Sequence, residues 1–303
     1  MRIVFMGTPD FAAPSLRRLV EDGHETAGVS TQPDRPKGRG YRLVPPPVKE
    51  LANEYSFDVF QPKGLKNPEA QGILEELRPE LIVVVAYGRI LPKAVLDLPA
   101  RGCINVHGSL LPKFRGAAPI QRAVMEGETV TGVTTMFMAE GLDTGDMLLR
   151  RETPIGENET AGELFERLAL LGADCLSETI RRLDEIVPQK QDEALATQAP
   201  PLRKEEGEVD WNRPAPELGC QIRGVTPWPA ATARLLDGRT LKIHRVKVTD
   251  FTGKPGELLD PKRLIVAAGE GSLELLEVQM EGAKRITGAE LIRGQRLTPG
   301  KLF

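Results

Sequence analysis

The stretch Leu81-Ile82-Val83-Val84-Val85-Ala86 decides the fold, because it is the clearest core strand in the chain. A continuous β-branched run of this kind is typical of a strand in the middle of a parallel sheet that helices cover. Toward the N-terminus, Arg2 to Met6 is expected to form a second buried strand, and Gly7 leads into a helix that ends near Val20. This opening is typical of nucleotide-binding α/β folds, although the full Gly-x-Gly-x-x-Gly fingerprint is absent. The sequence therefore predicts an α/β domain, and a dinucleotide cofactor is poorly supported.

Apolar periodicity predicts the other elements of this domain. Thr160 and Glu163 have the spacing of a capping box at the start of a long helix. Helices are expected at residues 47–55, 68–77, 119–126 and 160–187. Strands are expected at residues 24–31, 58–60, 103–106, 131–138 and 146–154.

Three polar side chains follow predicted strands and can act together. Asn105 and His107 are two residues apart, so they are expected to project to the same side as their strand ends. Asp143 lies between two glycines in the loop Gly141 to Asp146, where the backbone can turn closely. Each feature alone is often structural. Together, an amide, an imidazole and a carboxylate can perform acyl-transfer chemistry.

That chemistry has a physical basis. When an amine attacks a carbonyl, negative charge develops on the carbonyl oxygen, and the attacking nitrogen must lose a proton. The Asn105 amide or an N–H of His107 can stabilise the oxygen, and Asp143 can orient the imidazole or take the proton. A Ser or Cys nucleophile is not needed.

Two segments beside this site suit a flat ligand. Gly88, Arg89, Ile90 and Leu91 follow the core strand at its carboxyl end, where open α/β sheets place ligands, with hydrophobic packing as the alternative role. The loop Ser109-Leu110-Leu111-Pro112 can supply an apolar wall, while its exposed backbone groups pair with a heterocycle such as a pterin.

Residues 32–43 are basic and rich in Pro and Gly. The cations are Arg35, Lys37, Arg39 and Arg42. The Pro and Gly content predicts a mobile surface loop rather than a helix or a strand. A solvated charged loop is the plainer interpretation, but cations spaced by glycines also suit phosphate contacts.

The C-terminal third has a different character. Residues 188–208 are polar and contain Pro200-Pro201, which indicates a linker, and residues 209–303 contain short strand-like runs between glycine turns, which indicate a small barrel. From residue 203 onward, 17 Lys and Arg stand against 14 Asp and Glu, which permits contact with a polyanion. Candidate phosphate contacts are Arg223, Lys242, Arg245 and Lys247, each of which is also compatible with a solvated surface. His244 is expected to be structural.

The composition is ordinary for a soluble protein, with 40% hydrophobic and 27% charged residues. No apolar stretch approaches the length of a membrane span, and the first residues show no signal-peptide pattern, so we expect a cytoplasmic protein. Cys103, Cys175 and Cys220 are far apart and lack metal-binding spacing, so neither a disulfide nor a metal site is expected.

The ordered motifs resemble those of the folate-dependent formyltransferases, most closely the members that act on methionyl-tRNA. The resemblance covers nearly the whole chain. The residues that carry it are Asn105-x-His107, Ser109 to Pro112, Phe114-Arg115-Gly116-Ala117-Ala118-Pro119, Asp143 and Arg223-x-x-x-Pro227-Trp228-Pro229. The resemblance implies a Rossmann-like catalytic domain at residues 1–187, a linker at 188–208 and an OB-like β-barrel domain that binds tRNA at 209–303.

It also implies the reaction. The formyl group of 10-formyltetrahydrofolate is expected to pass to the amino group of methionyl initiator tRNA, without a metal. Asn105 and His107 would stabilise the oxyanion, and Asp143 would hold the imidazole and assist proton removal. The loop Ser109 to Pro112 would bind the folate. The basic segment would engage the acceptor end of the tRNA, with Arg42 as its first contact, and the protein is expected to be a monomer.

Three alternatives share parts of this pattern. A sugar-nucleotide N-formyltransferase would use the same residues on another amine, and a formyltetrahydrofolate hydrolase would use water. A noncatalytic RNA-binding protein would leave the combination of Asn105, His107 and Asp143 unexplained. The basic segment and the barrel-like C-terminal part favour a tRNA substrate.

Overall fold

The computed structural model describes residues 1–37, 42–260, 262–295 and 300–303. Internal contacts divide the chain into two compact units. Unit 1 comprises Met1–Gly116, Gly132–Thr153 and Phe165–Gln198, and unit 2 comprises Ala117–Thr131, Pro154–Leu164 and Ala199–Phe303. The domain boundaries at residues 187 and 208 stay a prediction. By internal contacts, the segments 117–131 and 154–164 group with the C-terminal part, although both precede residue 187 in the sequence.

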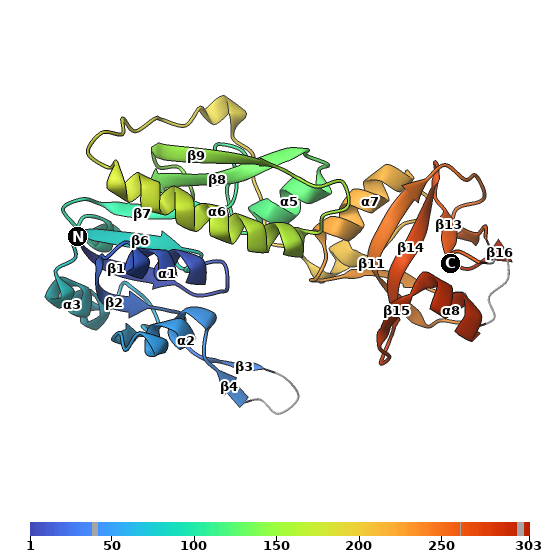
Figure 1. Ribbon diagram of the computed structural model, residues 1–303, viewed down its shortest axis with the longest axis horizontal. Coiled ribbons are helices and arrows are strands. Elements are labelled where there is room, and N and C mark those ends of the chain that lie inside the picture. The colour runs from blue at the N-terminus through green and yellow to red at the C-terminus, as the bar shows by residue number, and fades with distance from the viewer. Residues whose placement is uncertain (38–41, 261, 296–299) are drawn as a thin grey trace. The chain divides into compact units, whose positions relative to one another are not determined.

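Unit 1 is built on a mixed sheet with the strand order β5-β2-β1-β6-β7-β8-β9 (Figure 1). β6 lies between β1 and β7 and is parallel to both, as the core run predicted, whereas β8 is antiparallel to β7. The strands are β1 (Arg2–Gly7), β2 (Glu25–Ser30), β5 (Val59–Phe60), β6 (Leu81–Val85), β7 (Cys103–His107), β8 (Val130–Phe137) and β9 (Met147–Pro154). The Rossmann-like α/β fold is confirmed.

Helices cover both faces of this sheet because alternate strand residues are apolar on both sides. On one face, Val4 and Ile82 pack with Leu74 of α3 (Pro68–Leu77) and Val95 of α4 (Lys93–Leu96). Across the other face lie α1 (Ala13–Glu21) and residues 165–181 of α6 (Ala161–Arg181) (Figure 1). Gly172 of α6 leaves so little space that an added Cβ would lie 3.0 Å from Val106.

Several helices begin where the sequence predicted. α2 (Pro47–Glu54), α3 and α5 (Pro119–Met125) each start with proline, which is preorganised for the first helical position. At α6, Thr160 N donates to Glu163 Oε2 at 2.9 Å and Glu163 N donates to Thr160 Oγ1 at 3.3 Å, which confirms the capping box. The helix ends at Arg181 rather than at residue 187, and the chain turns before Pro188, which disfavours helical geometry in the preceding residue.

The prediction of a loop over residues 32–43 is wrong at residues 35–37 and 42–43, which lie in strands, whereas residues 32–34 lie in neither a helix nor a strand. β3 (Arg35–Lys37) and β4 (Arg42–Val44) form an antiparallel pair in which Arg35 lies opposite Val44. Pro36 is tolerated because a two-stranded ribbon has outward-facing edges on which a missing N–H costs no hydrogen bond. Arg39 and Tyr41 lie outside the described residues.

Unit 2 contains an antiparallel, curled sheet with the order β10-β11-β14-β13-β12-β16, and β15 pairs with β14 (Figure 1). The strands are β10 (Ala231–Arg234), β11 (Thr240–Thr249), β12 (Glu257–Leu258), β13 (Ile265–Ala267), β14 (Ser272–Met280), β15 (Arg285–Thr287) and β16 (Gly300–Lys301). The helices of this part are α7 (Ala215–Gly224), α8 (Gly288–Gln295) and the 3₁₀ turn η2 (Lys204–Gly207), while η1 (Glu193–Leu195) belongs to unit 1. This sheet agrees with the predicted OB-like architecture.

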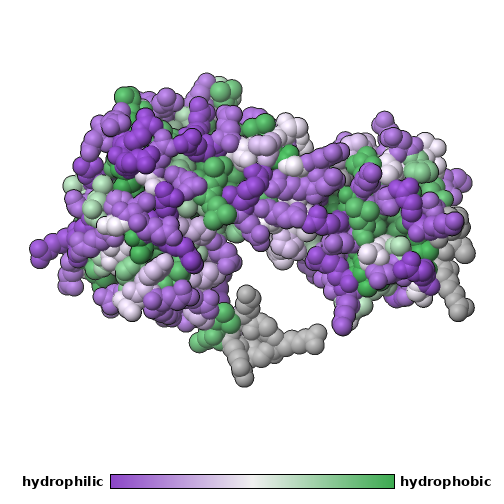
Figure 2. All heavy atoms as spheres, viewed as in Figure 1, coloured by the Kyte–Doolittle hydropathy of each residue, from purple (hydrophilic) through white to green (hydrophobic). Residues whose placement is uncertain are grey.

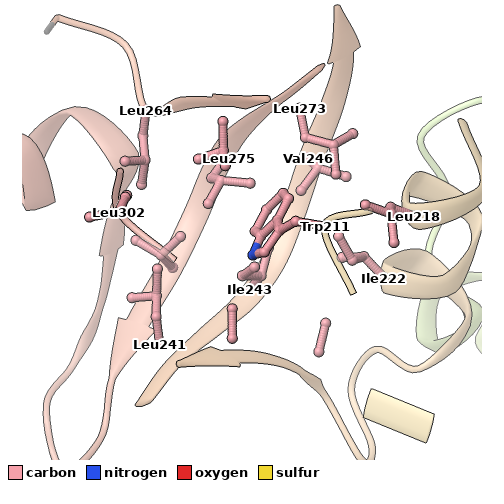
Figure 3. Packing of buried hydrophobic residues seen from close by; sticks show 14 of the residues in the cluster. Trp211, Leu218, Ile222, Leu241, Ile243, Val246, Leu264, Leu273, Leu275 and Leu302 are labelled. Atoms are coloured by element: carbon pink, nitrogen blue, oxygen red, sulfur yellow. The ribbon is translucent and has the colours of Figure 1, made fainter. Parts of the chain in front are cut away.

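The core of unit 2 surrounds Trp211 (Figure 3). Apolar residues from α7, such as Leu218 and Ile222, and from β11, such as Ile243, point toward the indole. The ring of Trp211 also stacks on Phe303, with centroids 4.9 Å apart. The C-terminal sheet therefore has a hydrophobic core of its own.

Hydrophilic side chains cover most of the face shown in Figure 2, with apolar side chains gathered in small patches between them. Among the described residues, no helix has the length and apolar character needed to span a membrane.

Candidate functional site

Strand β7 carries Asn105 and His107 to its carboxyl end. The parallel neighbour β6 places Val84 beside Asn105, and the antiparallel neighbour β8 places Thr134 beside His107. Because side chains alternate along a strand, both polar groups lie on one face, as predicted. They are 8% and 6% exposed. The buried sheet therefore presents an amide and an imidazole side by side.

The imidazole of His107 is held by a backbone carbonyl. Its Nε2 lies 2.8 Å from the oxygen of Phe114, and because a carbonyl can only accept, Nε2 carries the proton of this hydrogen bond. Phe114 adopts a φ of 61°, which is rare for a residue with a bulky side chain. Its N–H donates to Thr197 Oγ1 at 2.9 Å. With Nε2 occupied, Nδ1 is the nitrogen that can meet a substrate or a carboxylate.

Asp143 lies on the side of Nδ1. Its Oδ2 is 3.6 Å from His107 Nδ1 and accepts a hydrogen bond from Gly116 N at 2.8 Å. A separation of 3.6 Å is too long for a direct hydrogen bond. Asp143 itself has a φ of 53°, in the left-handed region. The structure thus brings the three predicted catalytic residues together, with Phe114 and Gly116 as their backbone partners.

Asn105 differs from its two neighbours, because no described residue forms a hydrogen bond with its side-chain amide. Its polar atoms are not among the buried unpaired atoms of the described residues, so they are open to solvent. The amide N–H is therefore available to an oxygen that arrives with a substrate.

Sequence reasoning missed Gln191, which lies in the segment predicted as a linker. Its Nε2 donates to the carbonyl oxygens of Asp143 and Gly145, both at 2.8 Å. Its Oε1 accepts from Arg115 Nε at 2.9 Å. A polar residue in a polar stretch gives no local signal for contacts of this kind.

Arg115 is occupied within the protein rather than presented to a substrate. Its guanidinium is 4% exposed and binds both carboxylate oxygens of Glu193 at 2.8 Å. These hydrogen bonds lower the pKa of the Glu193 carboxyl and raise the pKa of Arg115. The motif arginine thereby fastens residues 191–193 beside the site.

The two predicted ligand segments differ in their free backbone groups. Among the described residues, the backbone of Arg89, Ile90 and Leu91 has no hydrogen-bond partner, and Ile90 is 79% exposed. Gly88 O, in contrast, accepts from Gln32 Nε2 at 2.9 Å. Arg89 Nε is buried without a partner. This segment has groups to offer a ligand.

The loop Ser109 to Pro112 is more closely tied to the protein. Ser109 and Leu111 are fully buried, and each carbonyl of the loop accepts a hydrogen bond within the chain. Ser109 O accepts from Thr134 Oγ1 at 2.7 Å, and Leu110 O accepts from Lys113 N at 3.2 Å. Leu111 O accepts from an Arg150 NH group at 3.5 Å, and Pro112 O accepts from Thr197 N at 3.3 Å. The loop thus forms a fixed wall more than a set of free acceptors.

The predicted tRNA contacts differ in whether they already have partners within the protein. Arg35, Arg223 and Arg245 have partners: Arg35 donates to Gln32 Oε1 at 2.9 Å, Arg223 donates to Glu159 O at 3.0 Å, and Arg245 pairs with Glu163 and Glu277. Lys242 and Lys247, on β11, are exposed and have no ion pair with a described residue. Lys37 and Arg42 lie on β3 and β4.

The described side chains offer neither a metal cluster nor an activated thiol. Within the described ranges, no group of three or more His, Cys, Asp or Glu residues could hold a metal ion. Burial raises the pKa of the Cys103 thiol to about 12, so this cysteine is a buried apolar residue as expected. The chemistry that the described side chains can perform is amide, imidazole and carboxylate chemistry on a carbonyl group.

Comparison with known proteins shows the family of the chain. The formyl transferase family model matches residues 1–180, and the model of the formyl transferase C-terminal domain matches residues 201–296. A methionyl-tRNA formyltransferase of Geobacter sulfurreducens is 52% identical over 99% of this chain and 96% of its own length. One of Caldanaerobacter subterraneus subsp. tengcongensis is 49% identical over the full length of both chains.

Solved structures show the same fold. The N-formyltransferase of Helicobacter canadensis, in complex with folinic acid and dTDP-3-aminofucose, superposes with a TM-score of 0.69 at 17% identity, over 94% of this chain and all of its own. HypX of Aquifex aeolicus, in complex with tetrahydrofolic acid, gives a TM-score of 0.63 at 18% identity, over 96% of this chain and 47% of its own. On these matches together, the chain belongs to the formyl transferase family.

Proposed function

We propose that this protein transfers the formyl group of 10-formyltetrahydrofolate to the amino group of methionyl initiator tRNA. The observation that carries the proposal is the meeting of Asn105, His107 and Asp143 at the end of β7. Relatives that are about half identical to this chain over its whole length, and are named methionyl-tRNA formyltransferases, support the choice of substrate.

We assign a role to each side chain. The amine attacks the formyl carbon, a C–N bond forms, and negative charge develops on the formyl oxygen. The unpaired amide of Asn105 donates to this oxygen, and His107 can donate to it from Nδ1 when the imidazole carries a second proton besides the one at Nε2. The amine proton passes to Asp143, which Gly116 N–H holds at 2.8 Å. When the carbonyl re-forms, the bond between the formyl carbon and the folate nitrogen breaks, and that nitrogen takes up the proton that Asp143 accepted, which regenerates the carboxylate.

Folate recognition is assigned to the segment after β6. The unpaired backbone groups of Arg89 to Leu91 can pair with the edge of a pterin, and Ile90 and Leu110 offer apolar contact to its faces. The fixed loop Ser109 to Pro112 would act as a wall beside them. The tetrahydrofolate product leaves after transfer, so folate is a cosubstrate here.

The tRNA contacts are assigned to basic residues on both units. On the hairpin β3–β4 and the segment that joins its strands, Arg35, Lys37, Arg39 and Arg42 provide cations for the phosphates at the acceptor end. On unit 2, the exposed Lys242 and Lys247 are better candidates than Arg223 and Arg245, whose guanidinium groups already have partners. We propose that the protein is cytoplasmic, since translation initiation takes place in that compartment. We also propose that it is a monomer.

The test is transfer of labelled formyl from 10-formyltetrahydrofolate to a panel of acceptors. Methionyl initiator tRNA, free methionine, a sugar-nucleotide amine and water alone are compared in parallel. We expect label on the tRNA only. Label on the sugar, or released formate, would contradict the tRNA assignment and retain a formyl-transfer site. No turnover by a folded protein would favour the noncatalytic RNA-binding alternative.

A further inference from the structure

We infer that Gln191 is a positioning residue that holds Asp143 in its reactive conformation. This inference rests on the proposed formyl transfer and deepens it. In the described part of the chain, no hydrogen bond joins Gln191 to the imidazole of His107 or to the carboxylate of Asp143. It contacts the turn on which Asp143 stands.

The turn around Asp143 needs an external support. A φ of 53° places Asp143 in the left-handed region, which is unfavourable for a residue with a Cβ. The amide of Gln191 donates to the carbonyls on either side of Thr144, those of Asp143 and Gly145, at 2.8 Å each. One NH₂ group thus clamps both arms of the turn.

The orientation of Gln191 is itself determined. Its Oε1 faces Arg115 Nε at 2.9 Å, and a guanidinium can only donate, so the amide cannot be flipped without losing all three hydrogen bonds. Arg115 is fixed in turn by its bidentate pair with Glu193. The next residue, Gly116, donates its N–H to Asp143 Oδ2. The same short network therefore fixes the backbone and the carboxylate of Asp143.

A purely structural role is the alternative, in which Gln191 only anchors residues 189–198 to unit 1. The two roles predict different effects on the catalytic step, on substrate binding and on stability. A positioning residue alters the step that uses Asp143 and leaves substrate binding intact, whereas an anchoring residue alters stability.

Gln191→Glu is the discriminating variant, because it keeps the shape and the acceptor for Arg115 but removes the donor to both carbonyls. We expect kcat to fall about 10²-fold, the usual cost of a displacement of about 1 Å at a reacting group. KM for the folate and for the tRNA should stay within about twofold. The matched control is Gln189→Glu, the same change at an exposed residue of the same segment, and it should keep the wild-type rate.

A double variant shows whether Gln191 acts through Asp143. In an Asp143→Asn background, Gln191→Glu should lower the remaining rate by less than about twofold, since coupled residues are not additive. Equal fold losses in both backgrounds, or a wild-type kcat in Gln191→Glu, would overturn the inference. If Gln191→Glu does not fold, Gln191→Met, which has similar length and no charge, takes its place with the same expectations.

A readout without turnover separates this inference from the proposed function. The imidazole resonances of His107, assigned by their loss in His107→Gln, should shift in Gln191→Glu and not in Gln189→Glu. If the wild-type protein formylates no acceptor, the proposed function fails, and these resonances decide the positioning role alone. Unchanged His107 resonances would then contradict it.

Discussion

At the scale of single residues, the site is explained by which polar atoms already have partners. His107 uses Nε2 for Phe114 O, and Asp143 uses one oxygen for Gly116 N–H, while the amide of Asn105 has no partner among the described residues. That amide is open to solvent rather than buried without a partner, so an incoming substrate can reach it. We therefore infer that the amide of Asn105, which has no hydrogen-bond partner in the described protein, donates to the formyl oxygen.

Replacing Asn105 with Ala tests that role. The variant removes a donor that acts mainly in the transition state, so kcat should fall about 10²- to 10³-fold while KM changes little. Steady-state transfer to methionyl initiator tRNA provides the measurement, and thermal unfolding checks that the fold is kept. A loss confined to KM would indicate that Asn105 only binds substrate.

His244 gives a prediction on pH and stability. Burial first, and then the nearby Arg285, lower the pKa of this imidazole, which Gln279 and Arg285 hold by hydrogen bonds. The folded-state pKa lies below the unfolded one, so the stabilising contribution is complete above the unfolded value of about 6.5 and is lost as pH falls through the folded value. Between about pH 7 and 5, the melting temperature of His244→Gln should therefore fall less steeply than that of the wild type. Equal slopes of melting temperature against pH for His244→Gln and the wild type would contradict this account.

Asn105 and His107 could be predicted from the sequence, but Gln191 could not. The first two are separated by the two-residue repeat of a strand, which is a local rule. Gln191 reaches Asp143 across 48 positions of sequence and Arg115 across 76, and no periodicity connects them. Residues that support a site from distant segments appear only when the chain is folded.

At the scale of elements, proline correctly indicated where helices begin, but it wrongly indicated a loop where the chain forms a hairpin. Pro47, Pro68 and Pro119 each mark the first residue of a helix, because their fixed φ suits that position. In residues 32–43 the same residue type suggested a loop, yet Pro36 stands in β3 opposite Leu43. Strand pairing depends on a partner, which a single-segment pattern does not contain.

The hairpin carries a prediction of its own. Lys37→Gln with Arg42→Gln should raise KM for the tRNA, and each lost phosphate contact should reduce the slope of log affinity against log salt by about 0.7 to 0.9. The rate at saturating tRNA should be unchanged. Lys63→Gln with Lys66→Gln removes the same charge from exposed positions elsewhere on unit 1 and serves as the control. Equal effects of the two pairs would indicate a general charge effect rather than a contact.

At the scale of the whole molecule, each unit has a core of its own, but the two units are interleaved in sequence. α5 packs on α7 within unit 2, and an added Cβ at Gly224 would lie 2.2 Å from Met125. Composition and strand spacing predicted two architectures, and the change from a mixed to an antiparallel sheet agrees with that, while the boundary near residue 200 stays a prediction. They did not predict that residues 117–131 and 154–164 group with the C-terminal part, because this follows from tertiary packing alone.

The central claim is that Asn105, His107 and Asp143 carry out formyl transfer to methionyl initiator tRNA. The most direct measurement is the single-turnover rate of that transfer by the wild type, His107→Ala and Asp143→Asn at saturating substrates. The account predicts formylmethionyl-tRNA from the wild type and rates about 10²- to 10⁴-fold lower from each variant, with the folds intact. A near-wild-type rate from either variant would remove that residue from the mechanism, and no product from the wild type would contradict the account as a whole.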